Sequence, residues 1–230
     1  MHNRRKELPH YYGHRHRLRE RFLKQNMEVL APYEVIELLL TFTVPQRDIK
    51  PLAKKLLKHF GSISAILDAS PEELSSFPYI KEKSIALFKF IKQLALLYYK
   101  EKTTNIPLSL NFHQWVNYCI EKFGMDKEEN FYVYYLDSKF SLIKEVLLTK
   151  GIIDRAVVYP RQIMELALKY KSYSILLAHN HPNGNTSPSE DDITLTKALR
   201  FTADILGIIL YDHIIVSEKG YFSFRKEGII

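Results

Sequence analysis

The sequence predicts a chain of two parts: an all-helical N-terminal region, residues 1–105, and a domain of strands and helices, α/β or α+β in class, residues 106–230. The first part has apolar residues at helical spacing, whereas the second alternates β-prone runs with helical segments. The charge divides at the same place. Residues 1–105 hold 19 Lys+Arg and 11 Asp+Glu, a net charge of +8, and residues 106–230 hold 14 and 15, a net charge of −1. We therefore expect two parts with different binding partners.

The N-terminal part is expected to form four main helices, over residues 15–26, 32–42, 49–60 and about 81–102. In the third of these, apolar residues share one stripe, at Ile49, Leu52, Leu56 and Leu57. Asp48 would cap the start of this helix and Gly61 would end it. A shorter helix is expected after the capping box that begins at Ser70.

The segment 102–112 loses the helical pattern and contains Pro107, which predicts a linker between the two parts. After the linker, strands are expected over residues 131–137, 142–148, 156–159 and 175–179. The last of these is a continuous apolar run, as is typical of a strand buried on both faces. Helices are expected after Pro160 and over about 190–206, and the chain would end in a hairpin of residues 208–217 and 220–224.

Composition excludes several classes of protein. The single cysteine, Cys119, rules out a disulfide framework and a cysteine-based zinc module, and its helical spacing indicates a core position rather than a nucleophile. No apolar run approaches the roughly 18 residues of a membrane span, and the basic N-terminus lacks the apolar stretch of a signal peptide. We therefore expect a cytoplasmic protein with no membrane partner.

The clearest chemical signal is the segment 178–192, AHNHPNGNTSPSEDD. His179 and His181 fall at the end of the buried strand, and because side chains alternate along a strand, both imidazoles point to one side. Ser189 is placed to cap the following helix, which puts Asp192 at the third helical position. This carboxylate could bond the helix start, as in an ordinary capping box, or join the histidines as a third metal ligand.

Two imidazoles and one carboxylate suit zinc, and three protein ligands leave a fourth position for water, as in catalytic zinc sites. The alternative is a capped turn whose histidines only form hydrogen bonds. A second histidine pair, His14 and His16, has the same spacing but no third ligand placed nearby, so we expect no metal there. His213 is expected in the core or in contact with a metal ligand, rather than in direct catalysis.

With these residues in view, the sequence resembles a known family. The pattern H-x-H-x7-S-x2-D is the JAMM signature of MPN/JAB metalloproteases, and the form HNHPxGxxxPSxxD is similar to the RadC family, also called UPF0758. The segments GHRHRLRERFL, ELLLTFTVPQRDIKPLAKKLLKHFGS and YDHIIVS also resemble that family. The resemblance implies an MPN/JAB domain (cytidine-deaminase-like) with a mixed sheet, and one zinc ion per chain held by His179, His181 and Asp192. It also implies that Ser189 supports the reacting water or the oxyanion.

The same resemblance implies a glutamate general base ahead of the first strand. The family pattern E-x-F-x-V-x-x-L-D matches residues 129–137, which selects Glu129. From chemistry alone, Glu128 and Glu145 are competitors, and Glu129 could instead be a solvated charge in an acidic run. The chain departs from the family pattern at Tyr159 and Gln162, where histidine and glutamate are frequent, but neither position is among the implied metal ligands.

The basic N-terminal part resembles a degenerate helix-hairpin-helix module. Such hairpins use two glycines to bring backbone N–H groups close to a DNA phosphate, but here Tyr79 and Lys81 fill both glycine positions. We therefore expect this hairpin to serve packing. The arm over residues 4–21, in which arginines and histidines are interleaved with tyrosines, is a candidate for contact with DNA, the alternative being a solvated helix face.

Together these features predict a zinc-dependent hydrolase of the JAMM type, a metallopeptidase that cleaves an amide or isopeptide bond in an unidentified protein or peptide. Glu129 would take the proton of a water molecule and pass it to the leaving amine, and Ser189 would support the oxyanion. The alternative is a DNA-binding or DNA-repair-associated accessory protein whose MPN domain is a scaffold.

Overall fold

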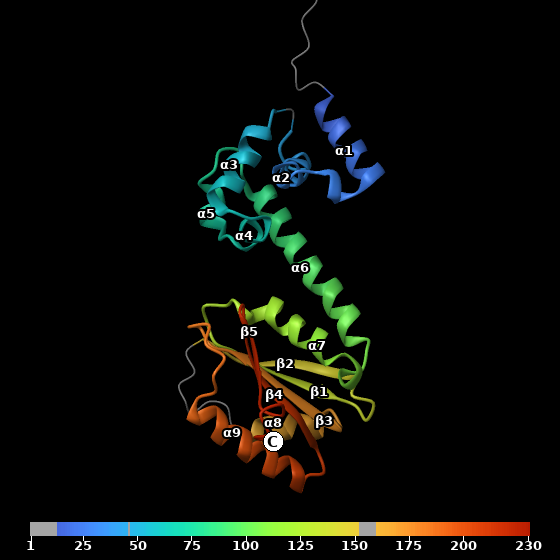
Figure 1. Ribbon diagram of the computed structural model, residues 1–230, viewed down its shortest axis with the longest axis vertical. Helices are drawn as coiled ribbons and strands as arrows, with labels where there is room; N and C mark the ends of the chain where they lie inside the picture. The colour runs from blue at the N-terminus through green and yellow to red at the C-terminus, as the bar shows by residue number, and fades with distance from the viewer. Residues whose placement is uncertain (1–12, 46, 152–159) are drawn as a thin grey trace, which may run out of the picture. The chain divides into compact units, whose positions relative to one another are not determined.

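The computed structural model describes residues 13–45, 47–151 and 160–230 (Figure 1). It divides into two compact units, Met1–Ala95 and Leu96–Ile230, and the boundary falls within one long helix, α6 (Glu82–Thr104). The strand expected over residues 156–159 and the first part of the basic arm, residues 1–12, lie outside the described residues.

The first unit is helical, as predicted. Its elements are α1 (His14–Gln25), the 3-10 turn η1 (Met27–Val29), α2 (Pro32–Leu40), α3 (Lys50–Phe60), α4 (Ile63–Asp68), α5 (Pro71–Ser75) and the start of α6. Buried apolar side chains of α2 to α6 form one core, which includes Leu56, Ile66 and Phe88. A smaller cluster around Leu18 joins α1 to α2. Removal of these side chains from water stabilises the packing of short helices that would be marginal alone.

Most helix ends in this unit follow the local signals. Gly61 ends α3 in the left-handed region, at φ 83°, and Ser70 begins α5 with the predicted capping box. The start of α3 differs by one residue from the prediction. Asp48 accepts the backbone N–H of Lys50 at 3.1 Å, but the residue at the cap itself is the buried Ile49.

The predicted linker over residues 102–112 is wrong. Helix α6 continues to Thr104 and α7 (Leu108–Cys119) begins at Leu108, so only residues 105–107 lie outside a helix. Pro107 stands just ahead of α7, where a missing N–H costs no helical hydrogen bond. Asn111 has a non-helical backbone (φ −145°, ψ 31°). This kink near the start of α7 lies within the segment in which the apolar residues lose the helical period.

The second unit contains a mixed sheet, as predicted, and five of its strands lie in the residues that the structure describes. Its strands are β1 (Asn130–Leu136), β2 (Leu142–Lys150), β3 (Ser174–Asn180), β4 (Ile209–Ser217) and β5 (Gly220–Ser223). They lie in the order β2-β1-β3-β4-β5, in which only the pair β3 and β4 is parallel. Helix α7 and the π-helical turn η2 (Ile120–Gly124) cover one face, and α8 (Pro160–Lys169) and α9 (Glu190–Ile205) cover the other (Figure 1).

Strand β3 lies at the centre of this sheet, and all of its residues are buried. Ile175 and Leu177 pack with α8 and α9, whereas Leu176 and Ala178 pack on the α7 side. The same alternation directs His179 toward α9 and Asn180 toward α7. The end of β3 therefore faces the start of α9 on one side and the loop that leads into β1 on the other.

Two further predictions concern the position of Cys119 and membrane-spanning segments. Cys119 is buried in the core on the α7 side, and burial raises the pKa of its thiol to about 12, so the predicted core position is confirmed. Within the described ranges, none of the helices combines the length and the apolar character needed to span a bilayer.

Candidate metal centre

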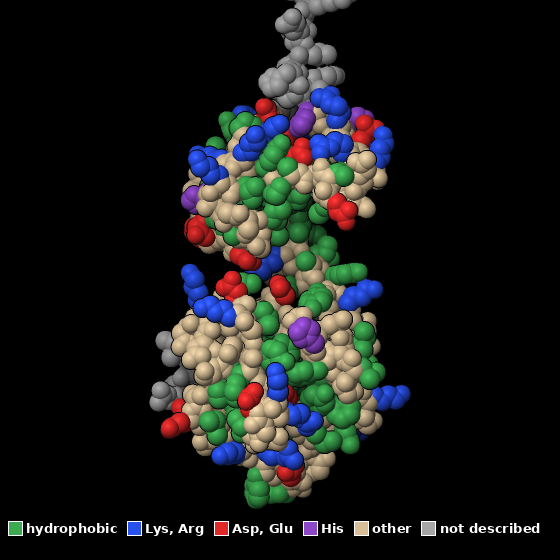
Figure 2. Space-filling model, in the orientation of Figure 1, with side chains coloured by type: hydrophobic (Ala, Val, Ile, Leu, Met, Phe, Trp, Pro, Cys, Tyr) green, Lys and Arg blue, Asp and Glu red, His purple; other side chains and the backbone are tan. Residues whose placement is uncertain are grey.

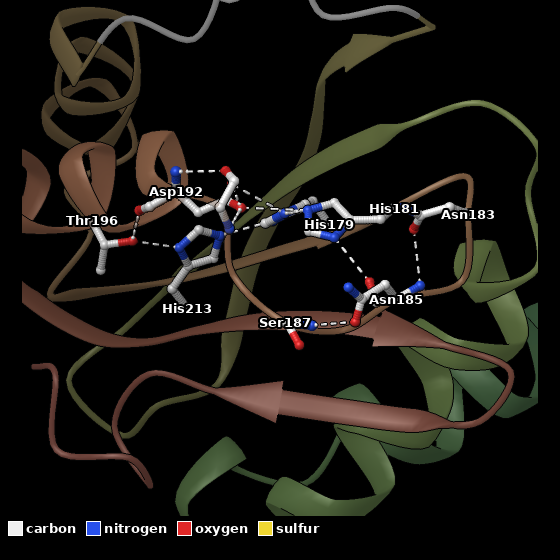
Figure 3. Close-up of polar contacts among 9 residues, drawn as sticks. His179, His181, Asn183, Asn185, Ser187, Asp192, Thr196 and His213 are labelled. Carbon is white, nitrogen blue, oxygen red and sulfur yellow. Dashed lines mark hydrogen bonds and ion pairs between the residues drawn. The ribbon is translucent and has the colours of Figure 1, made fainter.

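The histidines of the segment His179–Asn180–His181, here called the HNH segment, lie at the end of β3 beside the first turn of α9 (Figure 3). Nε2 of His179 lies 3.1 Å from Nε2 of His181. The carboxylate of Asp192 lies 3.3 Å from Nε2 of His179 and 3.4 Å from Nε2 of His181. His179 and Asp192 are buried, and His181 is half-buried. The structure thus brings the three predicted ligands into one cluster.

The spacing of these three groups fits a tetrahedral zinc ion. Zinc–ligand bonds of about 2.0–2.1 Å at tetrahedral angles place neighbouring ligand atoms about 3.3–3.4 Å apart. The two Nε2 atoms of His179 and His181, 3.1 Å apart, are close to one edge of such a tetrahedron. Each also has an oxygen of Asp192 nearby, since Oδ1 lies 3.3 Å from Nε2 of His179 and Oδ2 lies 3.4 Å from Nε2 of His181. Three protein donors leave a fourth corner for a reactant.

A backbone contact fixes the tautomer of His181. Its Nδ1 lies 2.9 Å from the carbonyl oxygen of Asn185. Because a carbonyl only accepts hydrogen bonds, Nδ1 of His181 carries a proton, and in the neutral ring Nε2 then presents a lone pair to the cluster. This is the second hydrogen bond that metal-ligating histidines commonly make.

Asp192 is held by the capping box at the start of α9. Its Oδ2 accepts the backbone N–H of Ser189 at 2.8 Å and the Ser189 hydroxyl at 2.7 Å, and Oγ of Ser189 accepts the N–H of Asp192 at 3.1 Å. Burial opposes ionisation, but the neighbouring imidazoles of His179 and His181 and the Ser189 hydroxyl hold the pKa of Asp192 well below its usual range. One carboxylate therefore caps the helix and faces both histidines.

Glu129 lies immediately before β1, at the point where Phe131 pairs with His179 across the sheet. A carboxylate oxygen of Glu129 lies within 4.8 Å of a ring nitrogen of both His179 and His181. Burial raises the pKa of Glu129 against the pull of the two imidazoles, and the charge of Asp192 raises it further. A carboxyl group in these surroundings is a better proton acceptor than an exposed one.

Asn180, the middle residue of the HNH segment, was not predicted as a site residue. Its side-chain oxygen accepts the backbone N–H of Asn130 at 2.9 Å, and its amide donates to the carbonyl oxygens of Asp126 at 3.0 Å and Glu128 at 3.1 Å. These bonds tie the loop that carries Glu129 to the strand that carries the histidines. The available signal was a polar residue inside an otherwise apolar buried strand.

His213 of β4 is buried beside His179, a predicted ligand, which confirms the expectation of a core position. Its Nε2 lies 2.9 Å from Nδ1 of His179, and its Nδ1 lies 2.6 Å from Oγ1 of Thr196. The ring stacks on Phe224 with centroids 4.6 Å apart, and burial lowers the pKa of His213 well below its usual range. Thr196 was not predicted, because no local pattern distinguishes it from other helical threonines.

A cavity of about 550 Å³ opens beside the cluster, and its lining includes Glu129, Phe131, His181, Asp192 and Leu195. This volume lies within the range of about 300–1,000 Å³ that is usual for ligand pockets. The predicted base and two of the predicted ligands therefore border a space that a substrate could enter.

Comparison with known proteins identifies the family. A family model described as the RadC-like JAB domain matches residues 110–229, and one described as UPF0758 N-terminal matches residues 11–86. The chain belongs to the RadC family. The RadC-like JAB domain includes every residue of the cluster described above.

Relatives of this RadC chain are named UPF0758 proteins. The one from Fusobacterium nucleatum is 37% identical over 225 residues, which cover 95% of this chain and 97% of that protein. Those from Rhodobacter capsulatus and Ruegeria pomeroyi are each 34% identical, with 93% and 97% of this chain covered and the whole of each relative matched. These matches confirm the resemblance seen in the sequence, and their names describe no activity.

The other glutamates considered as bases in this RadC domain have different surroundings. Glu145 of β2 is largely buried and forms ion pairs with two lysines, Lys100 at 2.8 Å and Lys122. Glu128 precedes the candidate base, and 59% of its side chain is exposed. Of the three, Glu129 is the one grouped with the two histidines among the described residues.

The second histidine pair, on α1, does not share one partner. Nε2 of His14 lies 2.9 Å from Glu37, whereas Nε2 of His16 lies 3.8 Å from Glu20. Residues two apart on a helix point in different directions, unlike residues two apart on a strand. The same H-x-H spacing therefore brings the two imidazoles together at the end of β3 but not on α1.

Proposed function

We propose that this RadC-family protein is a zinc-dependent hydrolase of the JAMM type, which cleaves an amide or isopeptide bond in a protein or peptide. The observation that carries the proposal is the pair of imidazole nitrogens 3.1 Å apart, with one carboxylate 3.3 and 3.4 Å from them. In the neutral tautomers that direct both Nε2 lone pairs into the cluster, a bound cation removes the repulsion between them. The donor set suits zinc, and Glu129 supplies a proton acceptor beside it.

His179, His181 and Asp192 would hold the metal and leave its fourth position to the reactants. When bound, zinc supplies a Lewis acid that polarises the scissile carbonyl and lowers the pKa of a water molecule toward about 7. Because this ligand set carries a single negative charge, the centre keeps a net positive charge with a divalent ion. That charge favours the oxyanion of acyl transfer.

Glu129 would accept the proton of the attacking water at one carboxylate oxygen and then donate it to the leaving amine. The raised pKa of Glu129 supports this role, because the group then binds a proton more readily. The resemblance assigns Ser189 to the oxyanion. Since the hydroxyl proton of Ser189 is directed at Asp192, we assign it first to the orientation of that carboxylate.

The test of the metal site compares His181→Ala with His16→Ala, a matched loss of one H-x-H histidine. Protein purified without chelators is analysed for zinc by mass spectrometry. We expect about one zinc per chain in the unaltered protein and in His16→Ala, and loss of zinc in His181→Ala. Metal-free unaltered protein, or equal zinc in both variants, would remove the basis of the proposal.

The basic first unit supports a separate proposal, that α1 contacts DNA. Arg17 and Arg19 are exposed on this helix, and basic side chains are numerous on the first unit in Figure 2. On the same helix, Arg15 donates to a backbone carbonyl at 2.8 Å and Arg21 pairs with a glutamate at 2.9 Å. The exposed guanidinium groups of Arg17 and Arg19 suit contact with a phosphate backbone.

The DNA proposal is tested by the double variant Arg17→Glu/Arg19→Glu, which reverses charge and keeps the buried Leu18. The control is Lys169→Glu/Lys197→Glu, an equal change of charge at exposed positions of the second unit. We expect weaker binding of duplex DNA and a shallower salt dependence for the first variant only. Equal binding by both variants would contradict a contact through α1.

A further inference from the structure

A chain of hydrogen bonds runs from His179 through β4 into α9 (Figure 3). Nδ1 of His179 lies 2.9 Å from Nε2 of His213, and Nδ1 of His213 lies 2.6 Å from Oγ1 of Thr196. Oγ1 of Thr196 lies 2.5 Å from the backbone carbonyl oxygen of Asp192. His179, Thr196 and His213 are fully buried, so bulk water does not compete for these bonds.

The last bond determines the direction of the others. A carbonyl oxygen has no proton, so the hydroxyl of Thr196 donates its single proton to Asp192. The hydroxyl oxygen must then accept from Nδ1–H of His213. A neutral imidazole with its proton on Nδ1 has a lone pair on Nε2, which therefore accepts from Nδ1–H of His179.

This direction leaves Nε2 of His179 with a lone pair, and Nε2 is the nitrogen that faces His181 and Asp192. The opposite tautomer has a competing attraction, because Oδ1 of Asp192, at 3.3 Å, would accept a proton from the same nitrogen. A histidine must be unprotonated at the nitrogen that binds metal. The chain of hydrogen bonds therefore decides whether Nε2 of His179 can bind metal or instead donates a hydrogen bond to Asp192.

We propose that His213 and Thr196 are positioning residues that hold His179 in its metal-binding tautomer. The proposal rests on the proposed zinc site and deepens it. The chain of hydrogen bonds starts at one proposed ligand, His179 on β3, and ends at the backbone of another, Asp192 on α9. It therefore also links two ligands that come from different elements of the domain.

Ordinary packing explains only part of this arrangement. Helical threonines often bond the carbonyl four residues earlier, and Thr196 does so. That bond does not require a histidine on the other side of the hydroxyl. His213 lies against the rings of Phe224 and Phe131, with centroids 4.6 and 5.6 Å away, where an apolar ring would also pack. The two nitrogens of His213 are what the hydrogen-bond chain uses.

The test compares Thr196→Val, which keeps the shape of the side chain but removes the hydroxyl, with Thr196→Ser, which keeps the hydroxyl. Zinc affinity of the full chain is measured by competition with a chromophoric chelator, and the visible spectrum is recorded with Co²⁺. We expect about 10–100-fold weaker zinc binding and an altered Co²⁺ spectrum for Thr196→Val. Thr196→Ser should bind zinc like the unaltered protein. Thermal unfolding verifies that both variants are folded.

A second measurement reads the tautomer directly. Nitrogen-15 NMR of the metal-free protein, at a pH where the rings are neutral, should show the proton of His179 on Nδ1 and its transfer toward Nε2 in Thr196→Val. Equal zinc affinity of the two Thr196 variants, or an Nε2 proton on His179 in the unaltered protein, would overturn the proposal. Failure of the zinc site itself looks different, because the unaltered protein would then bind no zinc while the NMR spectrum still reports the tautomer.

Discussion

Two carboxylates beside the histidine pair show how surroundings give one functional group different chemistry. Asp192 is bonded by Ser189 and lies beside both imidazoles, and these neighbours hold its pKa low despite burial. Burial is the largest influence on Glu129 and raises its pKa. Neighbouring acids whose pKa values are driven apart are suited to different tasks. We therefore treat Asp192 as the permanent anion and Glu129 as the group that moves a proton.

The variant Glu129→Gln tests this division. An amide cannot accept the proton of water, so we expect hydrolysis to fall by about 10²–10⁴-fold while the zinc content stays unchanged. Zinc is measured by mass spectrometry, and hydrolysis with a library of fluorogenic peptides and isopeptides. The control is Glu128→Gln, which removes the same charge from the exposed neighbour. Full activity in Glu129→Gln would contradict the role of general base.

A second prediction concerns Asn180, whose side chain holds the loop of Glu129 from the opposite face of β3. Asn180→Asp keeps the acceptor for Asn130 but removes the donors to the backbone carbonyl oxygens of Asp126 and Glu128. We expect the free energy of unfolding to fall by about 1–3 kcal/mol, because the two carbonyls each lose one hydrogen bond, although Glu128 still accepts from the Asn130 side chain. Hydrolysis should fall further than zinc affinity, because the ligands lie on the other side of the strand. Urea unfolding and zinc titration measure both effects, and equal loss of affinity and activity would argue against a specific effect on Glu129.

At the scale of elements, a buried carboxylate joins α1 to α2. Arg21 donates to both oxygens of Glu34, at 2.9 and 3.1 Å, and Glu34 also accepts the N–H of Ala31 at 3.0 Å, at the start of α2. The hydrogen bonds from Arg21 lower the pKa of Glu34, although burial opposes the shift. The ionised form of Glu34 is therefore favoured in the folded protein.

The variant Glu34→Gln should lower the free energy of unfolding by about 1 kcal/mol near neutral pH, a modest value because Arg21 is half exposed. The folded pKa of Glu34 lies below the ordinary value of 4.5. Its contribution is therefore present above that pH and is lost as the pH falls through the folded pKa. Urea unfolding at neutral and acidic pH should show a difference between the two proteins that shrinks in acid. A difference that is constant with pH would contradict a role for the charge.

At the scale of the whole molecule, the proposed chemistry and the excess charge lie in different units. The cluster, its base and its hydrogen-bond chain come from residues 129–213, all within the second unit. The positive charge lies in residues 1–105, whereas residues 106–230 are near neutral. The net charge of the protein therefore says nothing about the proposed reaction.

This division predicts that residues 96–230 retain the metal site without the first unit. The fragment keeps Tyr99, which packs against the core beneath α7. We expect it to bind about one zinc per chain with an affinity close to that of the full protein. Circular dichroism and zinc titration provide the measurement. A folded fragment that binds no zinc would show that the site depends on the first unit.

Local patterns account for most of the predicted elements. The capping boxes at Ser70 and Ser189, the glycine after α3 and the continuous apolar run of β3 are short-range signals that survive in the fold. The prediction failed where a local signal misled. Pro107 and the irregular Asn111 suggested a linker, whereas the chain forms helices on both sides of a short connection.

The sequence by itself determined the order of most helices and strands, the family, the candidate ligands His179, His181 and Asp192, and the neighbouring Ser189, because these residues lie within one strand, turn and helix. Only the tertiary structure decided what surrounds them. The pairing of β1 with β3 brings the loop of Glu129 to the histidines, and the parallel pairing of β3 with β4 brings in His213. Contacts of this kind join residues far apart in the chain, and they depend on strand register and burial rather than on any local pattern.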